Sequence, residues 1–283
     1  MHHRLASSSG RGLISVVLAG IAWGTGGPTG ALLFRTSGLG STAVSFWRLA
    51  GGALWLALAC RILGRGPIIQ QFRAAPLRYL LSGVGLAVCQ IGYFAAIPRV
   101  GVAVSTVVAL GAGPLLITLG ARERITAPLL LAVLGLGLLT SGSGGAGTDA
   151  LLGIAFSFLS AAGYAITTLL NRQQADPTTS ALLGFTTGAL ILLPPALIEG
   201  ITPAGRSLPL LAYFGLIPTA LAYVLFYTAL KSLKASTASV IALLEPLLAS
   251  AIGVLAFHEH PTPQALAGAA TLLTALALQA LRP

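Results

Sequence analysis

One carboxylate lies near the middle of a long apolar stretch of this chain, where Glu245 is followed directly by Pro246. A charged side chain at the centre of a bilayer costs about 2.5–3.5 kcal/mol on insertion scales, so an acid at such a position usually has a role. Glu245 could exchange protons as a site opens alternately to two sides, or bind the amino group of a substrate. It could also be a structural acid, hydrogen-bonded to the carbonyl of Ala242 that Pro246 leaves without its helical donor.

A second charge within an apolar run is Arg48, in the sequence SFWRLAGG. We expect its long side chain to extend outward to the membrane surface; the alternative is that it is a charge partner for a carboxylate or a substrate. Glu123 and Glu259 follow two similar apolar runs and are expected to cap the helices that begin next. His258 and His260 flank Glu259, and we interpret them as part of a solvated loop. We expect no catalytic residue, no metal and no cofactor.

Polar and aromatic side chains recur at helical spacing on four apolar runs. These stripes comprise Ser82, Gln90 and Tyr93; Ser157, Ser160, Tyr164, Thr167 and Asn171; Tyr213, Tyr223 and Tyr227; and Ser236, Ser239 and Ser250. Inside a bundle they could line a wet path, because buried polar groups need partners. The alternative is hydrogen bonding between helices by Ser and Thr, with tyrosines anchored near an interface. Our candidates for substrate contact are Gln90, Tyr93, Tyr164 and Tyr223.

Trp23 begins the sequence WGTGGPTG, which contains four glycines and Pro28. Proline removes a backbone donor and glycine adds conformational freedom, so this window predicts a broken or bent helix. Interrupted membrane helices often contact substrate near the midplane of the bilayer, which makes Trp23 a fifth candidate. The alternative is a helix-packing groove of small residues.

The elements that position these residues must be membrane helices. Of the 283 residues, 55% are apolar and 8% are charged, and the mean hydropathy is +0.90. Soluble domains average roughly 25% charged residues, so this chain must be solvated by lipid. The net charge of +10 would favour nucleic-acid binding in a soluble protein. Here the basic residues lie between apolar runs, which indicates membrane orientation and no nucleic-acid partner.

A membrane-spanning helix needs about 20 apolar residues, and ten such runs occur in the chain. They cover 12–34, 41–62, 76–97, 100–120, 125–142, 148–170, 179–198, 207–230, 233–256 and 262–281. With ten spans, most Arg and Lys residues lie on the side of the N-terminus, so we expect both termini in the cytoplasm. The predicted fold is therefore all-α, with ten transmembrane helices.

The second half of the chain contains an echo of the first. The stretch around Pro246 resembles TVVALGAGPLLITLGARERIT around Pro114, and HEHPT near its end corresponds to RERIT. Five helices in each half is an odd number, so the second half begins on the opposite side of the membrane. We expect two inverted five-helix repeats, over residues 1–145 and 146–283, which is an arrangement typical of transporters.

Several motifs, taken in chain order, resemble the EamA-type transporters of the drug/metabolite transporter superfamily. They are Trp23-Gly24, Arg48-Leu49, RERIT, LEPLLA with Glu245-Pro246, HEHPT and the small-residue helix QALAGAATLLTALALQ. The family often has glycine before the Glu of the two loop motifs, where this chain has Arg122 and His258. The resemblance implies a central, largely apolar cavity lined by helices one, three, four, six, eight and nine, with helices five and ten toward the outside.

Within that family the chain looks most like bacterial inner-membrane exporters of amino acids, aromatic ones included, and of related small metabolites. We expect alternating access, a small-molecule substrate, a lipid bilayer as partner and a monomer as one option for the oligomeric state. One alternative is a proton-coupled exporter of drugs or organic cations that uses Glu245. An alternative of another class is a membrane-embedded enzyme or scaffold.

Overall fold

The computed structural model of the protein describes residues 2–141, 149–172, 174–258 and 260–282. Every regular element in these residues is helical. In chain order the elements are α1 (His2–Gly24), α2 (Gly26–Thr36), α3 (Ser41–Ile62), α4 (Ile68–Ala74), α5 (Pro76–Gly120), α6 (Ala127–Leu139), α7 (Ala150–Asn171), α8 (Pro177–Glu199), η1 (Gly205–Ser207), α9 (Leu208–Gly215), η2 (Leu216–Leu221), α10 (Ala222–Ala229), α11 (Ala235–Ile241), α12 (Leu244–Phe257) and α13 (Pro263–Ala280).

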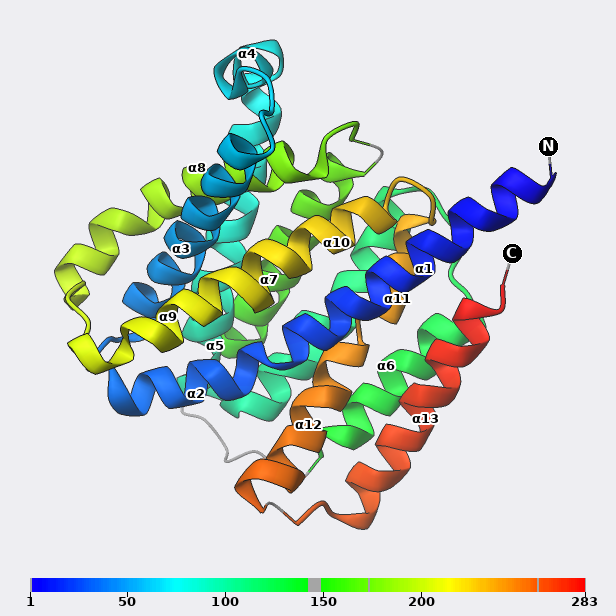
Figure 1. Ribbon diagram of the computed structural model, residues 1–283. Helices are drawn as coiled ribbons and strands as arrows, with labels where there is room; N and C mark the ends of the chain where they lie inside the picture. The colour runs from blue at the N-terminus through cyan, green and yellow to red at the C-terminus, as the bar shows by residue number, and fades with distance from the viewer. Residues whose placement is uncertain (1, 142–148, 173, 259, 283) are drawn as a thin grey trace.

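The prediction of an all-α membrane protein is confirmed at this level. Among the described residues, seven helical segments are long and apolar enough to cross a membrane. They are Gly10–Thr36, Ser41–Ile62, Pro76–Val102, Ala150–Asn171, Pro177–Glu199, Gly205–Ala229 and Ala235–Ala256. Two shorter apolar helices cover Val104–Gly120 and Ala127–Leu139. Each of the ten predicted apolar runs is mostly helical, and the two termini lie at the same end of the bundle (Figure 1).

The predicted interruption of the first helix is confirmed. Helix α1 ends at Gly24 and α2 begins at Gly26, so that Thr25 alone separates them. The Thr25 hydroxyl donates to the carbonyl of Ala22 at 2.8 Å and accepts a hydrogen bond from the Tyr213 hydroxyl of α9 at 3.0 Å. Side chains therefore help to satisfy the break in the helical ladder.

Helix α5 contains two predicted runs, 76–97 and 100–120, which are joined at a sharp turn. Gly101 has a φ of 77°, a left-handed conformation that glycine adopts without steric cost. The two arms are connected by a hydrogen bond of 2.8 Å between the hydroxyls of Tyr93 and Thr106. The first arm packs along α7 at close range, because a Cβ on Gly92 would lie 2.7 Å from the carbonyl oxygen of Phe156.

Two more predicted runs are irregular at their prolines. In the run 207–230, α9 passes into a π-helical turn, η2, which contains Pro218, before α10 begins. In the run 233–256, a turn at Ala242 and Leu243 separates α11 from α12, just before Glu245-Pro246. Neither proline can donate a backbone hydrogen bond, so the chain changes its helical geometry at both places.

Helices α6 and α13 lie side by side at one edge of the bundle (Figure 1). A Cβ on Gly135 of α6 would lie 2.6 Å from the backbone nitrogen of Leu272 of α13, so only a small residue allows this contact. These helices are the fifth and tenth predicted runs. Their pairing agrees with the outer position that the family resemblance implied.

The loops RERIT and HEHPT share one backbone design. Arg122 and His258 have φ values of 57° and 55°, in the left-handed region where the family often has glycine. Thr126 and Thr262 then cap α6 and α13, since their hydroxyls accept from backbone N–H groups three residues later.

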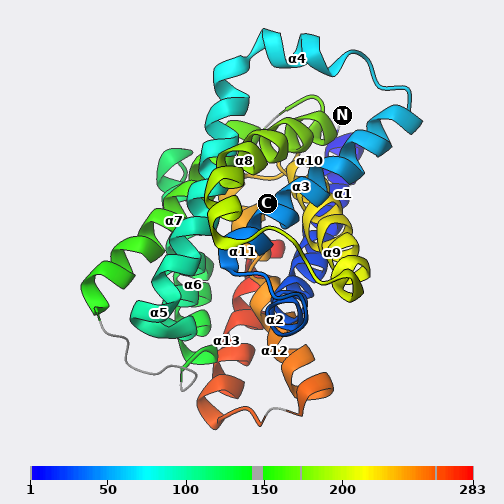
Figure 2. The same cartoon turned by 90° about the vertical axis from the view of Figure 1, so that its left-hand side faces the viewer.

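The longest predicted connection contains an element that the sequence analysis did not identify. Helix α4 forms within the segment RILGRGPIIQQFRAAP, between α3 and α5. It stands at the end of these two helices, away from the rest of the bundle (Figure 2). Each of its residues is at least partly exposed.

Candidate functional site

An aromatic cluster forms where α1, α7, α8 and α10 meet. The ring centroids of Trp23 and Tyr223 are 5.1 Å apart, with the rings nearly perpendicular. Phe226 lies 5.1 Å from Trp23 and stacks at 6.1 Å on Tyr164. Phe185 also contacts Tyr223, at 5.1 Å. The fold thus brings three of the predicted candidates into one cluster: Phe226 joins Tyr164 to Trp23, and Trp23 contacts Tyr223.

The members of this cluster differ in exposure. Trp23 is 4% exposed, whereas Tyr164 and Tyr223 are half-buried, so Trp23 supports the ring of Tyr223 from within the packed core. Phe226 and Phe185 are fully buried and were not predicted. The spacing of Phe226, three residues after Tyr223 on one helix face, could have identified it. Nothing in the run around Phe185 distinguishes it from other apolar residues.

Glu245 lies in the first turn of α12, directly after the break that separates α11 from α12. The positive end of a helix dipole favours a carboxylate there. The backbone N–H of Glu245 donates to the carbonyl of Ala242 at 3.0 Å. That carbonyl is the one that Pro246 leaves without its helical donor. Within the described residues the Glu245 side chain forms no hydrogen bond to this carbonyl, so the structural alternative lacks the hydrogen bond that it proposed.

Close packing against α1 fixes the start of α12. A Cβ on Gly24 would lie 2.6 Å from the Leu248 Cβ and 3.0 Å from the carbonyl oxygen of Glu245. One turn earlier, a Cβ on Gly20 would lie 3.0 Å from the Leu244 Cβ. Two glycines four residues apart therefore let α1 approach the backbone that carries Glu245. Of the WGTGGPTG window, Gly24 thus acts in close helix packing alongside the helix break, whereas a Cβ on Gly27 or Gly30 would meet nothing within 4 Å.

Arg48 lies inside the bundle, and the expectation that it extends to the membrane surface is wrong. Its Nε donates to the Thr219 hydroxyl at 3.3 Å, and a terminal nitrogen donates to the carbonyl of Pro218 at 3.4 Å. Its guanidinium carbon lies 5.2 Å from the centre of the Phe214 ring. The Thr219 hydroxyl donates in turn to the carbonyl of Phe214 at 2.8 Å, which Pro218 cannot bond. The π-helical turn η2 therefore provides the contacts that hold Arg48.

Arg48 and Glu245 lie within electrostatic range of each other. Glu245 lies within electrostatic range of Arg48, Cys89, Tyr93, Tyr164 and Tyr223. Arg48, Glu245 and the three tyrosines are each half-buried. In the part of the chain that the structure describes, no ion pair within 4.0 Å joins Arg48 to Glu245. Their opposite charges therefore lie near each other without forming a direct ion pair.

Gln90 lies on α5 one turn before Tyr93, and both residues are half-buried. Within the described residues the Gln90 side chain forms no hydrogen bond, whereas the Tyr93 hydroxyl bonds Thr106. Gln90 thus keeps its hydrogen-bonding capacity available, as a substrate-contacting residue requires. Tyr93 uses its hydroxyl to connect the two arms of α5.

Most of the predicted polar stripes between α5 and α7 connect the two helices. The Ser160 hydroxyl donates to the carbonyl of Cys89 at 2.8 Å, and the Thr167 hydroxyl donates to the carbonyl of Ser82 at 3.1 Å. Asn171 donates to the Ser82 hydroxyl at 2.8 Å. For these side chains the alternative interpretation, hydrogen bonding between helices, is confirmed.

Glu123 caps a helix, but not the one that follows it. Its carboxylate accepts hydrogen bonds from the backbone N–H groups of Ala235 and Ser236, at 3.2 and 3.1 Å, and from the Ser236 hydroxyl. Glu123 therefore caps α11, and Thr126 caps α6. The expected cap on the following helix is wrong. The corresponding prediction for Glu259 lies outside the described residues.

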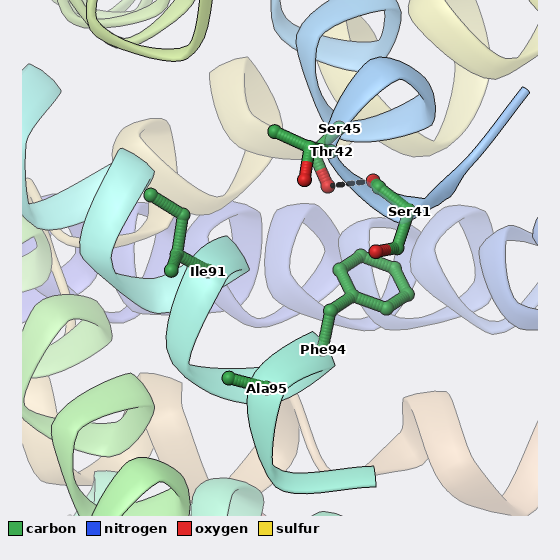
Figure 3. Close-up of a pocket in the computed structure, with 6 residues that line it drawn as sticks. All are labelled: Ser41, Thr42, Ser45, Ile91, Phe94 and Ala95. Atoms are coloured by element: carbon green, nitrogen blue, oxygen red, sulfur yellow. Dashed lines mark hydrogen bonds between the residues drawn. The ribbon is translucent and has the colours of Figure 1, made fainter. Parts of the chain in front are cut away.

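Two cavities lie elsewhere, and neither is lined by Arg48, Glu245 or a residue of the aromatic cluster. A cavity of about 170 Å³ opens between the first turns of α3 and the first arm of α5 (Figure 3). It is lined by Ser41, Thr42, Ser45, Ile91, Phe94 and Ala95. A second cavity, of about 270 Å³, lies beside the Glu123 cap and is bordered by Arg172 and residues 230–235. The sequence analysis predicted neither cavity.

Comparisons with known proteins extend over almost the whole chain. The sequence profile of the EamA-like transporter family matches residues 150–281. The chain is 32% identical over 280 residues to "Uncharacterized transporter YwfM" of Bacillus subtilis (strain 168), and the match covers 92% of this chain and 90% of that protein. It is 30% identical over 276 residues to an "Uncharacterized transporter" of Archaeoglobus fulgidus, with 93% of each covered.

A solved structure described as "Crystal structure of protein" superposes with a TM-score of 0.77 at 19% sequence identity. The superposition covers 96% of this chain and 97% of that one, so the two share a fold. The sequence relatives carry the family assignment, and they point to transport and not to enzymatic chemistry. The chain belongs to the EamA-like transporter family and is a multi-pass membrane transporter of small molecules.

Proposed function

We propose that this transporter exports amino acids, including aromatic ones, and related small metabolites across the bacterial inner membrane by alternating access. The observation that carries the proposal is the meeting of Arg48, Glu245 and three half-buried tyrosines beside two interrupted helices. Interrupted helices at the midplane are where many secondary transporters bind substrate. Trp23, Gln90, Tyr93, Tyr164 and Tyr223 shape or contact the central site, and Glu245 couples it or recognises substrate.

The proposed mechanism needs two units that move against each other. We assign these to two inverted five-helix repeats, residues 1–145 and 146–283, with both termini in the cytoplasm. The shared design of the RERIT and HEHPT loops supports the repeat, since Arg122 and His258 have the same left-handed backbone. The pairing of α6 with α13 supports it as well, because these are the last helices of the two units. The excess of Arg and Lys on the side of the termini supports the orientation.

The chemistry of the site favours zwitterions with apolar side chains. Aromatic rings offer a large apolar surface, and one Arg with one Glu supplies one charge of each sign. Phosphates and sugar phosphates would need several buried basic groups, because a buried charge requires compensation. Among the residues that the structure describes, Arg48 is the basic group whose charge acts on Glu245.

The second candidate is a proton-coupled exporter of drugs or organic cations. It is favoured by the position of Glu245 within electrostatic range of Tyr164 and Tyr223, because carboxylates and aromatic faces both attract cations. In that function Arg48 would repel the substrate.

Efflux from proteoliposomes separates the two candidates. Vesicles containing the purified protein are loaded with labelled phenylalanine, leucine, a quaternary ammonium ion or glucose 6-phosphate. We expect efflux of the amino acids above the rate of protein-free vesicles, and none of the sugar phosphate. Efflux of the quaternary ammonium ion alone would favour the second candidate, and efflux of neither class would reject both.

A further inference from the structure

Contacts with η2 and Phe214 hold the Arg48 side chain but use only some of its hydrogen-bond donors. Two of its N–H groups are bonded to Thr219 and Pro218, and its plane lies near the ring of Phe214. A guanidinium carries five N–H donors. In the part of the chain described by the structure, the remaining donors of Arg48 have no hydrogen-bond acceptor. The side chain is thus oriented by η2 and able to bind another group.

Glu245 has unused hydrogen-bond acceptors, as Arg48 has unused donors. Its backbone N–H is used locally by Ala242, while its carboxylate accepts no hydrogen bond within the described residues. A half-buried carboxylate in an apolar bundle needs a partner, because an uncompensated charge there is costly. Arg48 is within electrostatic range but beyond the 4.0 Å limit of an ion pair. Each charged group therefore has unused hydrogen-bonding capacity and lies within electrostatic range of the other.

We propose that Arg48 and Glu245 form a two-point site for a zwitterion, in which Arg48 binds the carboxylate and Glu245 binds the ammonium group of one ligand. This inference rests on the proposed function and names how its substrate is recognised. A ligand with both charges satisfies both side chains. A ligand with one charge leaves the other side chain uncompensated, and sites with buried polar groups reject such analogues strongly.

The aromatic residues then select the rest of the ligand. Tyr164 and Tyr223 are half-buried and lie within electrostatic range of Glu245. The close approach of Gly24 to the Glu245 carbonyl places Trp23, which contacts Tyr223, beside the start of the same helix. Trp23 and Phe226 hold these rings by the edge and stacking contacts described above. An apolar or aromatic side chain on the ligand would lie against them.

The test is a competition assay in proteoliposomes with labelled phenylalanine. The competitors are unlabelled phenylalanine, phenethylamine, which lacks the carboxylate, and 3-phenylpropanoate, which lacks the ammonium group. For the wild-type protein we expect phenylalanine to compete at least about tenfold better than either analogue. Arg48→Gln should erase the preference over phenethylamine, and Glu245→Gln should erase the preference over 3-phenylpropanoate.

Arg99→Gln is the matched control. Arg99 also lies in an apolar helix, donates to a backbone carbonyl, that of Ala95, and lies 5.0 Å from the ring of Phe156. We expect this variant to keep both preferences. If Arg48→Gln and Glu245→Gln weaken transport of all ligands without changing the competition ratios, the two-point site is wrong and the residues are structural.

A binding measurement on the wild-type protein tests the site even if the variants do not fold. Phenylalanine should raise the melting temperature of the purified wild-type protein, and neither analogue should do so at the same concentration. Equal shifts from all three compounds would overturn the two-point site even if transport is unaltered. If the wild-type protein binds phenylalanine with the expected selectivity but moves no amino acid, the proposed function fails and the site stands.

Discussion

The carboxylate of Glu123 accepts hydrogen bonds from both the backbone N–H and the hydroxyl of Ser236, a residue 113 positions away in the chain. The loop after α5 thereby caps α11, the helix whose end leads to Glu245. This contact ties the first part of the chain to the second, and Figure 1 shows α11 beside α1 near the end of the bundle where the termini lie.

Removing this cap should destabilise the protein. Glu123→Ala leaves the first N–H groups of α11 without an acceptor, so we expect a loss of about 1 kcal/mol in stability. The measurement is the melting temperature of the purified protein in detergent. Ser236→Ala is the control: it removes the hydroxyl but keeps the backbone contact, and it should have a smaller effect. Equal effects of the two substitutions would contradict the capping role.

Replacing Arg122, whose backbone is left-handed, with glycine should stabilise the protein. Arg122 has a φ of 57°, a conformation that costs an L-residue about 1–2 kcal/mol. Arg122→Gly should raise stability by about 0.5–1 kcal/mol, because glycine adopts this conformation freely but loses more chain entropy on folding. Arg122→Ala keeps the Cβ and should bring no such gain. A gain in both variants would indicate that the side chain, and not the backbone, is the source of the strain.

Close packing beside Glu245 predicts that alanine substitutions in the glycine-rich window 23–30 have different effects at different positions. Gly24→Ala places a Cβ against Leu248 and the Glu245 carbonyl, and overpacking of this kind costs about 1–3 kcal/mol. We expect lower stability and slower transport. Gly27→Ala is the matched control, because a Cβ there meets nothing within 4 Å. Similar behaviour of the two variants would show that α1 does not determine the position of α12.

The start of α8 predicts a pH dependence of stability. Burial alone would raise the pKa of Asp176, but hydrogen bonds from Thr179 and Arg65 outweigh it and hold the pKa below its ordinary value. A carboxyl whose pKa is lowered on folding adds stability above its unfolded pKa, and this contribution is lost as the pH falls through the folded pKa. Melting temperatures between about pH 7 and about pH 3 should therefore fall more for the wild-type protein than for Asp176→Asn.

A smaller change at the same place is the control for this prediction. Thr179→Val removes the hydroxyl that donates to Asp176 at 2.6 Å but leaves the Arg65 contact intact. It should reduce the pH dependence without abolishing it. The same acid sensitivity in the wild-type protein and in Asp176→Asn would assign that sensitivity to other groups.

The positions of the helices could be predicted from the sequence, because ten apolar runs separated by polar turns are a strong signal. The break at Thr25 was predictable as well, since glycine and Pro28 weaken the same window. The geometry at Pro218 and Pro246 was not. A proline indicates a missing hydrogen bond, but the neighbours decide how the chain replaces it. At Pro218 the replacement depends on Thr219, which also accepts a hydrogen bond from Arg48 of a distant helix.

Side-chain partners were the least predictable part of the site. Spacing on single helices selected Tyr164 and Tyr223 as candidates for substrate contact, and the fold brings both into one aromatic cluster, although spacing gave no reason to include Phe185. It also placed Arg48 at the membrane surface and paired Glu123 with the wrong helix. Both errors have one cause: the true partners lie on helices far away in sequence, and a pattern within one helix contains no information about them.

The most direct test of the transport account is counterflow of labelled phenylalanine into proteoliposomes that are preloaded with unlabelled phenylalanine. The account predicts transient accumulation above the external concentration for the wild-type protein and for Arg99→Gln, and a strong reduction for Arg48→Gln. Uptake by the wild-type protein no faster than in protein-free vesicles, for phenylalanine and for every other amino acid tried, would contradict it.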